Sequence, residues 1–146
     1  MPSTTFDRIA LASEQLDAAI EIFLAERSDV SALTLAGAAE EILGQAVRQS
    51  GGENAMQQAF EIMAETHKGL HRTEPRWQDF TEGENFARNA AKHMRTPEEA
   101  TVTTDLRRAA QWMIVRACAN YDRLDLERTD RMREFDNWFH EYEVGI

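Results

Sequence analysis

The stretch SALTLAGAAEEILGQAV, residues 31–47, decides the fold. Its side chains are small or apolar over more than half of a helix circumference, a pattern that indicates a helix buried on several sides. Ser28 or Asp29 can cap the start of this helix, and the pair Gly51-Gly52 stops it after Gln49. We therefore expect a central helix around which the other helices pack.

The rest of the chain repeats its apolar residues at intervals of three and four, and no period-two strand pattern is found. Cap and turn signals divide the chain into about six helices with short connections. They cover approximately residues 6–27, 28–49, 53–71, 82–95, 104–126 and 129–143, with residues 73–81 as a loop around Pro75 and Thr103 or Thr104 as the cap of the fifth helix. The sequence predicts an all-α, single-domain helical bundle over residues 1–146.

Length and composition limit the class of protein. A chain of 146 residues suits one domain with one core. The only cysteine, Cys118, forms no internal disulfide, and no basic and apolar leader precedes Phe6, so we expect the reducing cytoplasm. Apolar runs are too short for a membrane helix, which needs about 20 residues, and no membrane partner is expected.

The net charge of −10 is unevenly distributed along the sequence. Residues 66–95 hold 6 basic and 4 acidic side chains and three of the four histidines, whereas the segments on both sides are acidic. Phosphate contacts require arginine and lysine, so this segment is the one expected to meet a nucleic acid.

The segment FARNAAKHM, residues 86–94, lies in this cationic region. At 100° per residue it forms a helix with an apolar half and a polar half. Asn89 and His93 are neighbours at i and i+4, while Arg88 and His93 lie about 140° apart, near opposite edges of the polar half. The polar half contains Asn85, Arg88, Asn89, Lys92, His93 and Arg95; the apolar half contains Phe86, Ala87, Ala90, Ala91 and Met94.

These residue types suit RNA cleavage without a metal ion. A ribose 2′-hydroxyl attacks the adjacent phosphate when a general base removes its proton, and histidine titrates in the right range for that role. Arginine matches a phosphate with its planar fork, and an asparagine beside it can orient it or hold a sugar or phosphate oxygen. A requirement for the 2′-hydroxyl selects RNA over DNA.

The pattern RNAAKH, an arginine and a histidine separated by four residues with a polar residue after the arginine, resembles the signature of the HEPN superfamily. The resemblance extends to a small helical bundle with the motif on a late helix. It implies a metal-independent endoribonuclease with Arg88 and His93 as the catalytic pair and Asn89 as the supporting polar residue. Lys92 and Asn85, on the same polar half, are further candidates for support or RNA binding. It also implies a role as a toxin, defence effector or RNA-processing domain, and a homodimer whose motifs share one cleft. Partners that it brings into consideration are an antitoxin and a nucleotidyltransferase.

Glu40 is a further candidate, because it falls inside the apolar arc of the central helix, where a carboxylate needs a partner. Its functional interpretation is an ion pair that holds Arg88; the alternative is a pair with another arginine or a half-exposed side chain. Gly37 and Gly44, seven residues apart on this helix, allow a neighbouring helix to approach closely.

For the whole chain, the alternative to an enzyme is a noncatalytic module that binds a protein or a nucleotide through the same polar face of the helix at residues 86–94.

Other features carry less functional information. His67 and His71 have the i, i+4 spacing of metal ligands, with Glu65 or Asp79 as a third, but no spacing marks a complete site, so we expect no metal and no cofactor. Cys118 is expected in the core and His140 at the surface. The last helix aligns five large apolar residues for the core or for a partner groove: Met132, Phe135, Trp138, Phe139 and Tyr142.

Overall fold

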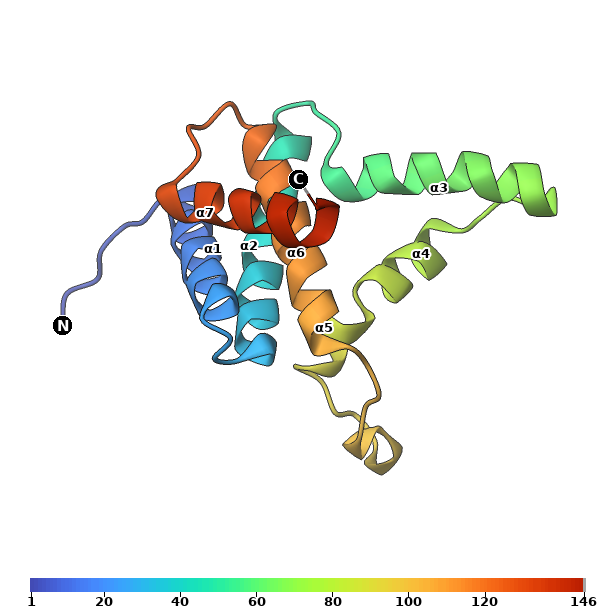
Figure 1. Cartoon of the computed structure of the whole chain (residues 1–146), viewed down its shortest axis with the longest axis horizontal. Helices are drawn as coiled ribbons and strands as arrows, with labels where there is room; N and C mark the ends of the chain where they lie inside the picture. The colour runs from blue at the N-terminus through green and yellow to red at the C-terminus, as the bar shows by residue number, and fades with distance from the viewer. Residues whose placement is uncertain (146) are drawn as a thin grey trace.

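The central helix predicted from residues 31–47 is α2 (Asp29–Gln49), which packs along both α1 (Arg8–Leu24) and α6 (Leu106–Asp122) in a computed structural model that describes residues 1–145 (Figure 1). No strand occurs among these residues, so the predicted all-α class is confirmed. The remaining elements are α3 (Ala55–His71), α4 (Trp77–Glu84), α5 (Phe86–Ala90), the 3₁₀ helix η1 (Pro97–Ala100), α7 (Asp130–Phe139) and the π-helical turn η2 (His140–Val144).

Short polar side chains cap the long helices. Ser28, the first of the two predicted caps, accepts a hydrogen bond from the backbone of Ser31 at the start of α2. Asn54 and Gln57 form a reciprocal capping box at α3. The predicted cap of α6 is wrong: Asp105, not Thr103 or Thr104, accepts from the backbone N–H of Arg108, because its carboxylate reaches the third residue of the helix.

The core lies between α1, α2 and α6, with α7 laid across them (Figure 1). Phe23 of α1 meets Phe135 and Trp138 of α7 edge to face, with ring centroids 5.8 and 5.0 Å apart. The predicted apolar row of the last helix is thus split: Met132 and Phe135 are buried, whereas Tyr142 is exposed in η2. The π-helical turn replaces the regular helix from His140, and Tyr142 nevertheless packs on Trp138, with ring centroids 5.7 Å apart.

An arm formed by α3 and α4 extends from this core (Figure 1). Phe60 of α3 holds the arm together by packing on Trp77 and Phe80 of α4, with ring centroids 5.3 and 5.5 Å apart. At its base, the buried Asn120 of α6 accepts a hydrogen bond of 2.8 Å from the backbone N–H of Ala55. The start of α3 is therefore fixed to the core, while most of α3 lies at the surface.

The predicted loop at 73–81 and the predicted single helix at 82–95 are both wrong, so residues 1–145 contain seven α-helices where about six were expected. α4 begins at Trp77, since its aromatic side chains pack on Phe60 of α3. The chain then breaks at Asn85, where φ and ψ are −103° and 8° and where the side-chain oxygen accepts from Arg116. α5 consequently turns Ala87 into the core and leaves Phe86 and Met94 exposed.

No helix within residues 1–145 combines the length and the apolar character needed to cross a membrane.

The thiol of Cys118 is buried in α6, as the sequence predicts, and burial raises its pKa to about 12. The folded state thus favours the protonated thiol over the thiolate. The stability that this preference contributes is complete below the ordinary pKa of 9.0, and it is lost as the pH rises towards 12. We predict that the unfolding free energy of the protein, relative to Cys118→Ala, falls by about 2 kcal/mol between pH 8 and pH 10.5. Urea denaturation of both proteins measures this difference, and a constant difference contradicts the burial of the thiol.

Candidate active site

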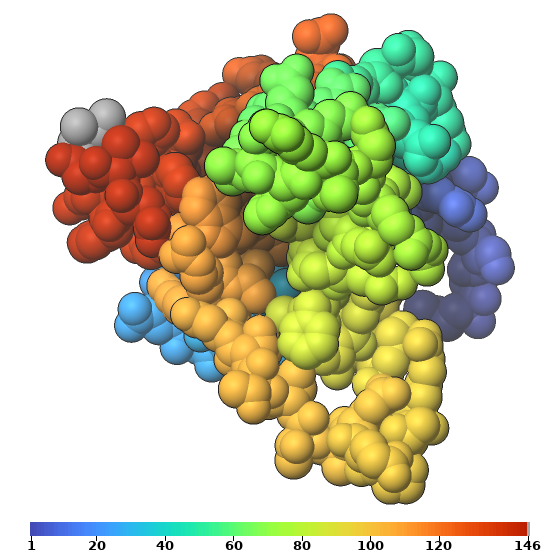
Figure 2. Space-filling view, turned by 90° about the vertical axis from the view of Figure 1, so that its right-hand side faces the viewer, coloured from blue at the N-terminus to red at the C-terminus, as the bar shows by residue number. Residues whose placement is uncertain are grey.

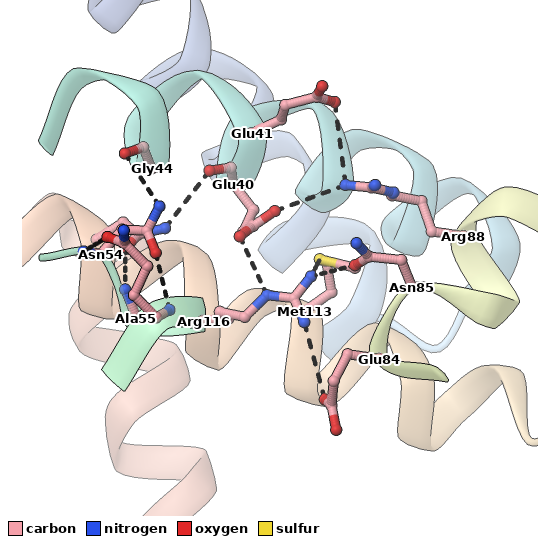
Figure 3. Close-up of polar contacts among 12 residues, drawn as sticks. Glu40, Glu41, Gly44, Asn54, Ala55, Glu84, Asn85, Arg88, Met113 and Arg116 are labelled. Atoms are coloured by element: carbon pink, nitrogen blue, oxygen red, sulfur yellow. Dashed lines mark hydrogen bonds and ion pairs between the residues drawn. The ribbon is translucent and has the colours of Figure 1, made fainter. Parts of the chain in front are cut away.

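Glu40 lies at the centre of a buried ion-pair cluster between α2, α5 and α6 (Figure 3). One carboxylate oxygen is 3.6 Å from Nη1 of Arg88 and the other is 3.1 Å from Nε of Arg116. The side chains of Glu40, Arg88 and Arg116 are only 8, 13 and 11% exposed. The predicted pair between Glu40 and Arg88 is therefore present, and a second arginine shares the same carboxylate.

Arg88 reaches Glu40 by lying across the backbone of α2 at Gly37. A Cβ atom at Gly37 would be 2.5 Å from Cδ of Arg88 and 3.0 Å from its Cγ, so only glycine leaves room for this side chain. Outside the cluster, the exposed Glu41 lies 4.0 Å from Nη1 of Arg88. The guanidinium is thus held from the inside by the buried Glu40 and approached from the outside by the exposed Glu41.

Arg116 completes the cluster from α6. Its Nη1 lies 3.9 Å from Glu84, and its Nη2 donates to the side-chain oxygen of Asn85. The Nε atoms of Arg88 and Arg116 are buried without an aligned hydrogen-bond acceptor, so the short contact between Arg116 and Glu40 is an ion pair of poor hydrogen-bond geometry. Two buried guanidiniums share one buried carboxylate, and Glu41 and Glu84 supply the remaining negative charge at the edge.

His93 lies outside this cluster. α5 ends at Ala90, but the backbone N–H of His93 still donates to the carbonyl of Asn89 over 3.1 Å, which continues the helical path by one turn. Asn89 and His93 line a hollow of about 650 Å³ together with residues of the η1 segment, such as Glu98. The imidazole is exposed to solvent in this hollow.

The predicted site residues are therefore divided between two hollows of one chain. Glu40, Asn85 and Arg88 line a hollow of about 190 Å³ between α2 and the arm, whereas Asn89 and His93 line the larger one. Lys92 is exposed and lines neither hollow. Within one subunit, Arg88 and His93 remain on the separate edges that their spacing predicts.

Arg116 was not among the residues predicted from the sequence, although the pattern that identifies Glu40 also applies to it. Arg116 lies in α6 among residues that are mostly buried, including Met113 and Ala117. A charged residue within an apolar arc needs a partner of the opposite charge. Two such residues on neighbouring helices, Glu40 and Arg116, could have been paired from the pattern alone.

The two histidines with metal-ligand spacing are in contact, but they belong to a different network. The rings of His67 and His71 are 4.8 Å apart, and Nε2 of His67 lies 2.9 Å from the hydroxyl of Thr73. In the part of the chain that the structure describes, no three or more histidine, cysteine or acidic side chains are grouped as metal ligands would be. His140 is exposed, as expected, and contacts Asp136.

Replacement of the buried carboxylate tests the cluster. Glu40→Gln leaves two guanidiniums without their shared partner, so we predict a loss of about 3 to 5 kcal/mol in unfolding free energy. Glu41→Gln is the matched control, because Glu41 is 69% exposed and its removal should change stability by less than about 0.5 kcal/mol. Chemical denaturation gives both values, and equal losses in the two variants would show that Glu40 has no special role.

The close approach at Gly37 gives a second prediction. Gly37→Ala should destabilise the protein, because the added methyl group displaces the Arg88 side chain from Glu40. In an Arg88→Ala background the same change should stabilise it by up to about 1 kcal/mol, since alanine favours the helix and the clash is gone. Gly69→Ala, whose added Cβ meets open space in α3, is the control that should be stabilising in both backgrounds. Denaturation of the double-mutant cycle measures the coupling, and its absence refutes the contact.

Comparison with protein-family models, with curated proteins and with solved structures finds no match for this chain. The resemblance to the HEPN superfamily therefore depends on the motif around Arg88 and His93 and on the helical class.

Proposed function

We propose that the protein is a cytoplasmic, metal-independent endoribonuclease of the HEPN type, with Arg88 and His93 as its catalytic pair. The observation that carries this proposal is the restraint on Arg88. Its stem is fixed over Gly37 and its guanidinium is held by the buried Glu40, so the charge is positioned before any substrate arrives. Preorganised charge of this kind lowers the barrier of phosphoryl transfer.

The proposed reaction uses only groups of this chain and water. The exposed imidazole of His93 takes the proton from a ribose 2′-hydroxyl, and the 2′-oxygen forms a bond to the adjacent phosphorus. The bond from phosphorus to the 5′-oxygen breaks, and that oxygen takes up a proton from a water molecule to leave as a hydroxyl, while the imidazolium of His93 returns its proton to the solvent. Arg88 neutralises the charge that develops on the phosphoryl oxygens. The products are a 2′,3′-cyclic phosphate and a 5′-hydroxyl end.

A homodimer is part of the proposal, because Arg88 and His93 of one chain line separate hollows. A second copy can bring its imidazole to the first copy's guanidinium across a two-fold axis, where the same surface of both subunits meets. Asn89 follows Arg88 directly in the sequence, but it supports the imidazole side, since it lines the hollow of His93. The target RNA and a partner such as an antitoxin or a nucleotidyltransferase belong to this same proposal.

A noncatalytic module that binds a protein or a nucleotide is the second candidate. It is favoured by the contacts of Arg88, whose guanidinium is approached by two carboxylates, Glu40 and Glu41, rather than left open for a phosphate. In this case the cluster serves stability, and His93 is a surface residue without a chemical role.

Cleavage of labelled RNA in the presence of excess chelator separates the two candidates. We predict fragments with cyclic phosphate ends for the unaltered protein and at least a hundredfold slower cleavage for His93→Ala, because general acid–base catalysis contributes about 10²- to 10⁴-fold. His140→Ala is the control, since it removes an exposed histidine that does not line the hollow of His93. Circular dichroism confirms that both variants fold. Equal cleavage by all three proteins, or none by the unaltered protein, refutes the enzymatic proposal.

A further inference from the structure

A groove of about 530 Å³ runs between α6 and the α3–α4 arm. Figure 2 shows the surface hollowed between the orange segment, which contains the start of α6, and the yellow-green segment, which contains α4. Small side chains such as Ala55, Ala59 and Ala109 form much of its lining. The groove exists because α3 is fixed to α6 only near its start, where Asn120 holds Ala55, and then diverges.

Two arginines give this groove a positive charge that the protein does not neutralise. Arg108 and Arg123 line it, and within residues 1–145 neither makes an ion pair with a carboxylate. Arg123 donates to neutral groups, the carbonyl of Ala119 and the side chain of Gln58, so its charge remains. In a chain with a net charge of −10, a pair of uncompensated cations along one groove indicates an anionic ligand.

The acidic residues of the groove do not cancel these charges. Glu84 pairs with Arg116, which the Glu40 cluster already holds. Asp105 is the cap of α6 and accepts from the backbone of Arg108. Each carboxylate in the lining thus has a partner other than the guanidiniums of Arg108 and Arg123.

An exposed aromatic ring lies between the two cations. Trp112 lines the groove and is 43% exposed, and its ring is kept in place by Phe139, whose centroid is 5.7 Å away at an interplanar angle of 80°. Arg108 and Arg123 are 15 residues apart on α6, which corresponds to about 22 Å along the helix axis. Cations spaced along a groove with an aromatic platform between them match the chemistry of single-stranded nucleic acid, because the phosphates meet the cations and a base stacks on the ring.

The groove lies beside the hollow that contains His93. Phe86 lines both, so the two are neighbours at the surface of α5. A flexible chain with phosphates at regular intervals can follow this path, whereas an acidic protein helix is straight and would fill only the groove. The adjacency of the two hollows favours a nucleic-acid strand over a helical protein partner.

We propose that this groove binds a single RNA strand, with Arg108 and Arg123 at its phosphates and Trp112 under one of its bases. The position of the strand relative to His93 rests on the proposed ribonuclease function; binding in the groove does not. The groove supplies the affinity that the acidic surface of the protein otherwise opposes.

Binding of a fluorescent, single-stranded 2′-O-methyl RNA tests the proposal, because this probe lacks the hydroxyl nucleophile and cannot be cleaved. Anisotropy titrations at several salt concentrations give the affinity and its salt dependence. The double variant Arg108→Gln/Arg123→Gln should bind more weakly and lose about 1.4 from the slope of log K against log salt, at about 0.7 for each lost phosphate contact. Arg48→Gln, which removes an exposed arginine on α2 outside the groove, is the control and should leave the groove contacts intact.

The aromatic platform has its own pair of variants. Trp112→Ala should weaken binding about 5- to 100-fold, whereas Trp112→Phe, which keeps a stacking face, should retain most of the affinity. Circular dichroism and light scattering of each variant show whether the fold and the oligomeric state are unchanged. A loss of affinity in both Trp112→Ala and the double arginine variant, with the fold intact, supports the proposal.

Three results would overturn the groove assignment. The first is unaltered affinity in the groove variants. The second is a change of self-association without a change of RNA affinity, which would make the groove a protein interface. The third is RNA cleavage by the unaltered protein that continues at the same rate in the variants of Arg108, Trp112 and Arg123. This result would leave the proposed ribonuclease function intact. Conversely, binding that depends on the groove without any cleavage supports the groove and refutes the ribonuclease.

Discussion

The buried carboxylate of Glu40 is the constraint on which the arrangement of α2, α5 and α6 depends. A lone carboxylate in this position would cost several kcal/mol, so the helices around α2 must bring cations to it. Arg116 does so from α6 and Arg88 from α5. The path of the chain between Asn85 and Ala90 follows from this requirement, because α5 has only five residues and little apolar surface of its own to hold it.

Two glycines of α2 leave room for polar side chains to pack against the backbone of this helix inside the bundle. Arg88 lies over Gly37, and the amide of Asn120 lies against Gly44, where an added Cβ would be 3.1 Å from its Nδ2. Asn120 also joins the carbonyl of Glu40 to the backbone of Ala55 at the start of the arm. The ion-pair cluster around Glu40 and the hydrogen bonds of Asn120 are thus linked through α2, so the same helix positions the arm and the candidate site.

The sequence was sufficient to predict α2 and its cap, because the apolar pattern, the capping residue and the glycines that end the helix all lie within one short segment of the chain. It also singled out Glu40, since one acidic residue in an apolar arc requires a partner, but it left open whether that partner was Arg88 or another arginine and whether the side chain was half-exposed. The break at Asn85 was not predictable, because it depends on Arg116, which is 31 residues away. The start of α4 at Trp77 likewise depends on packing against Phe60. Contacts between distant residues override local helical periodicity in both places.

The ion-pair cluster also determines how a phosphate could reach Arg88 in the proposed ribonuclease. Glu40 is not the carboxylate that a phosphate displaces, because its removal would leave both Arg88 and Arg116 unpaired in a buried position. Glu41 is exposed, 4.0 Å from the same guanidinium, and free to turn into solvent at little cost. In the proposed ribonuclease, the substrate phosphate therefore replaces Glu41 beside the guanidinium, while Glu40 continues to hold Arg88 over Gly37. In this arrangement Glu41 lowers the affinity for phosphate, and Glu40 sets the direction from which the arginine meets it.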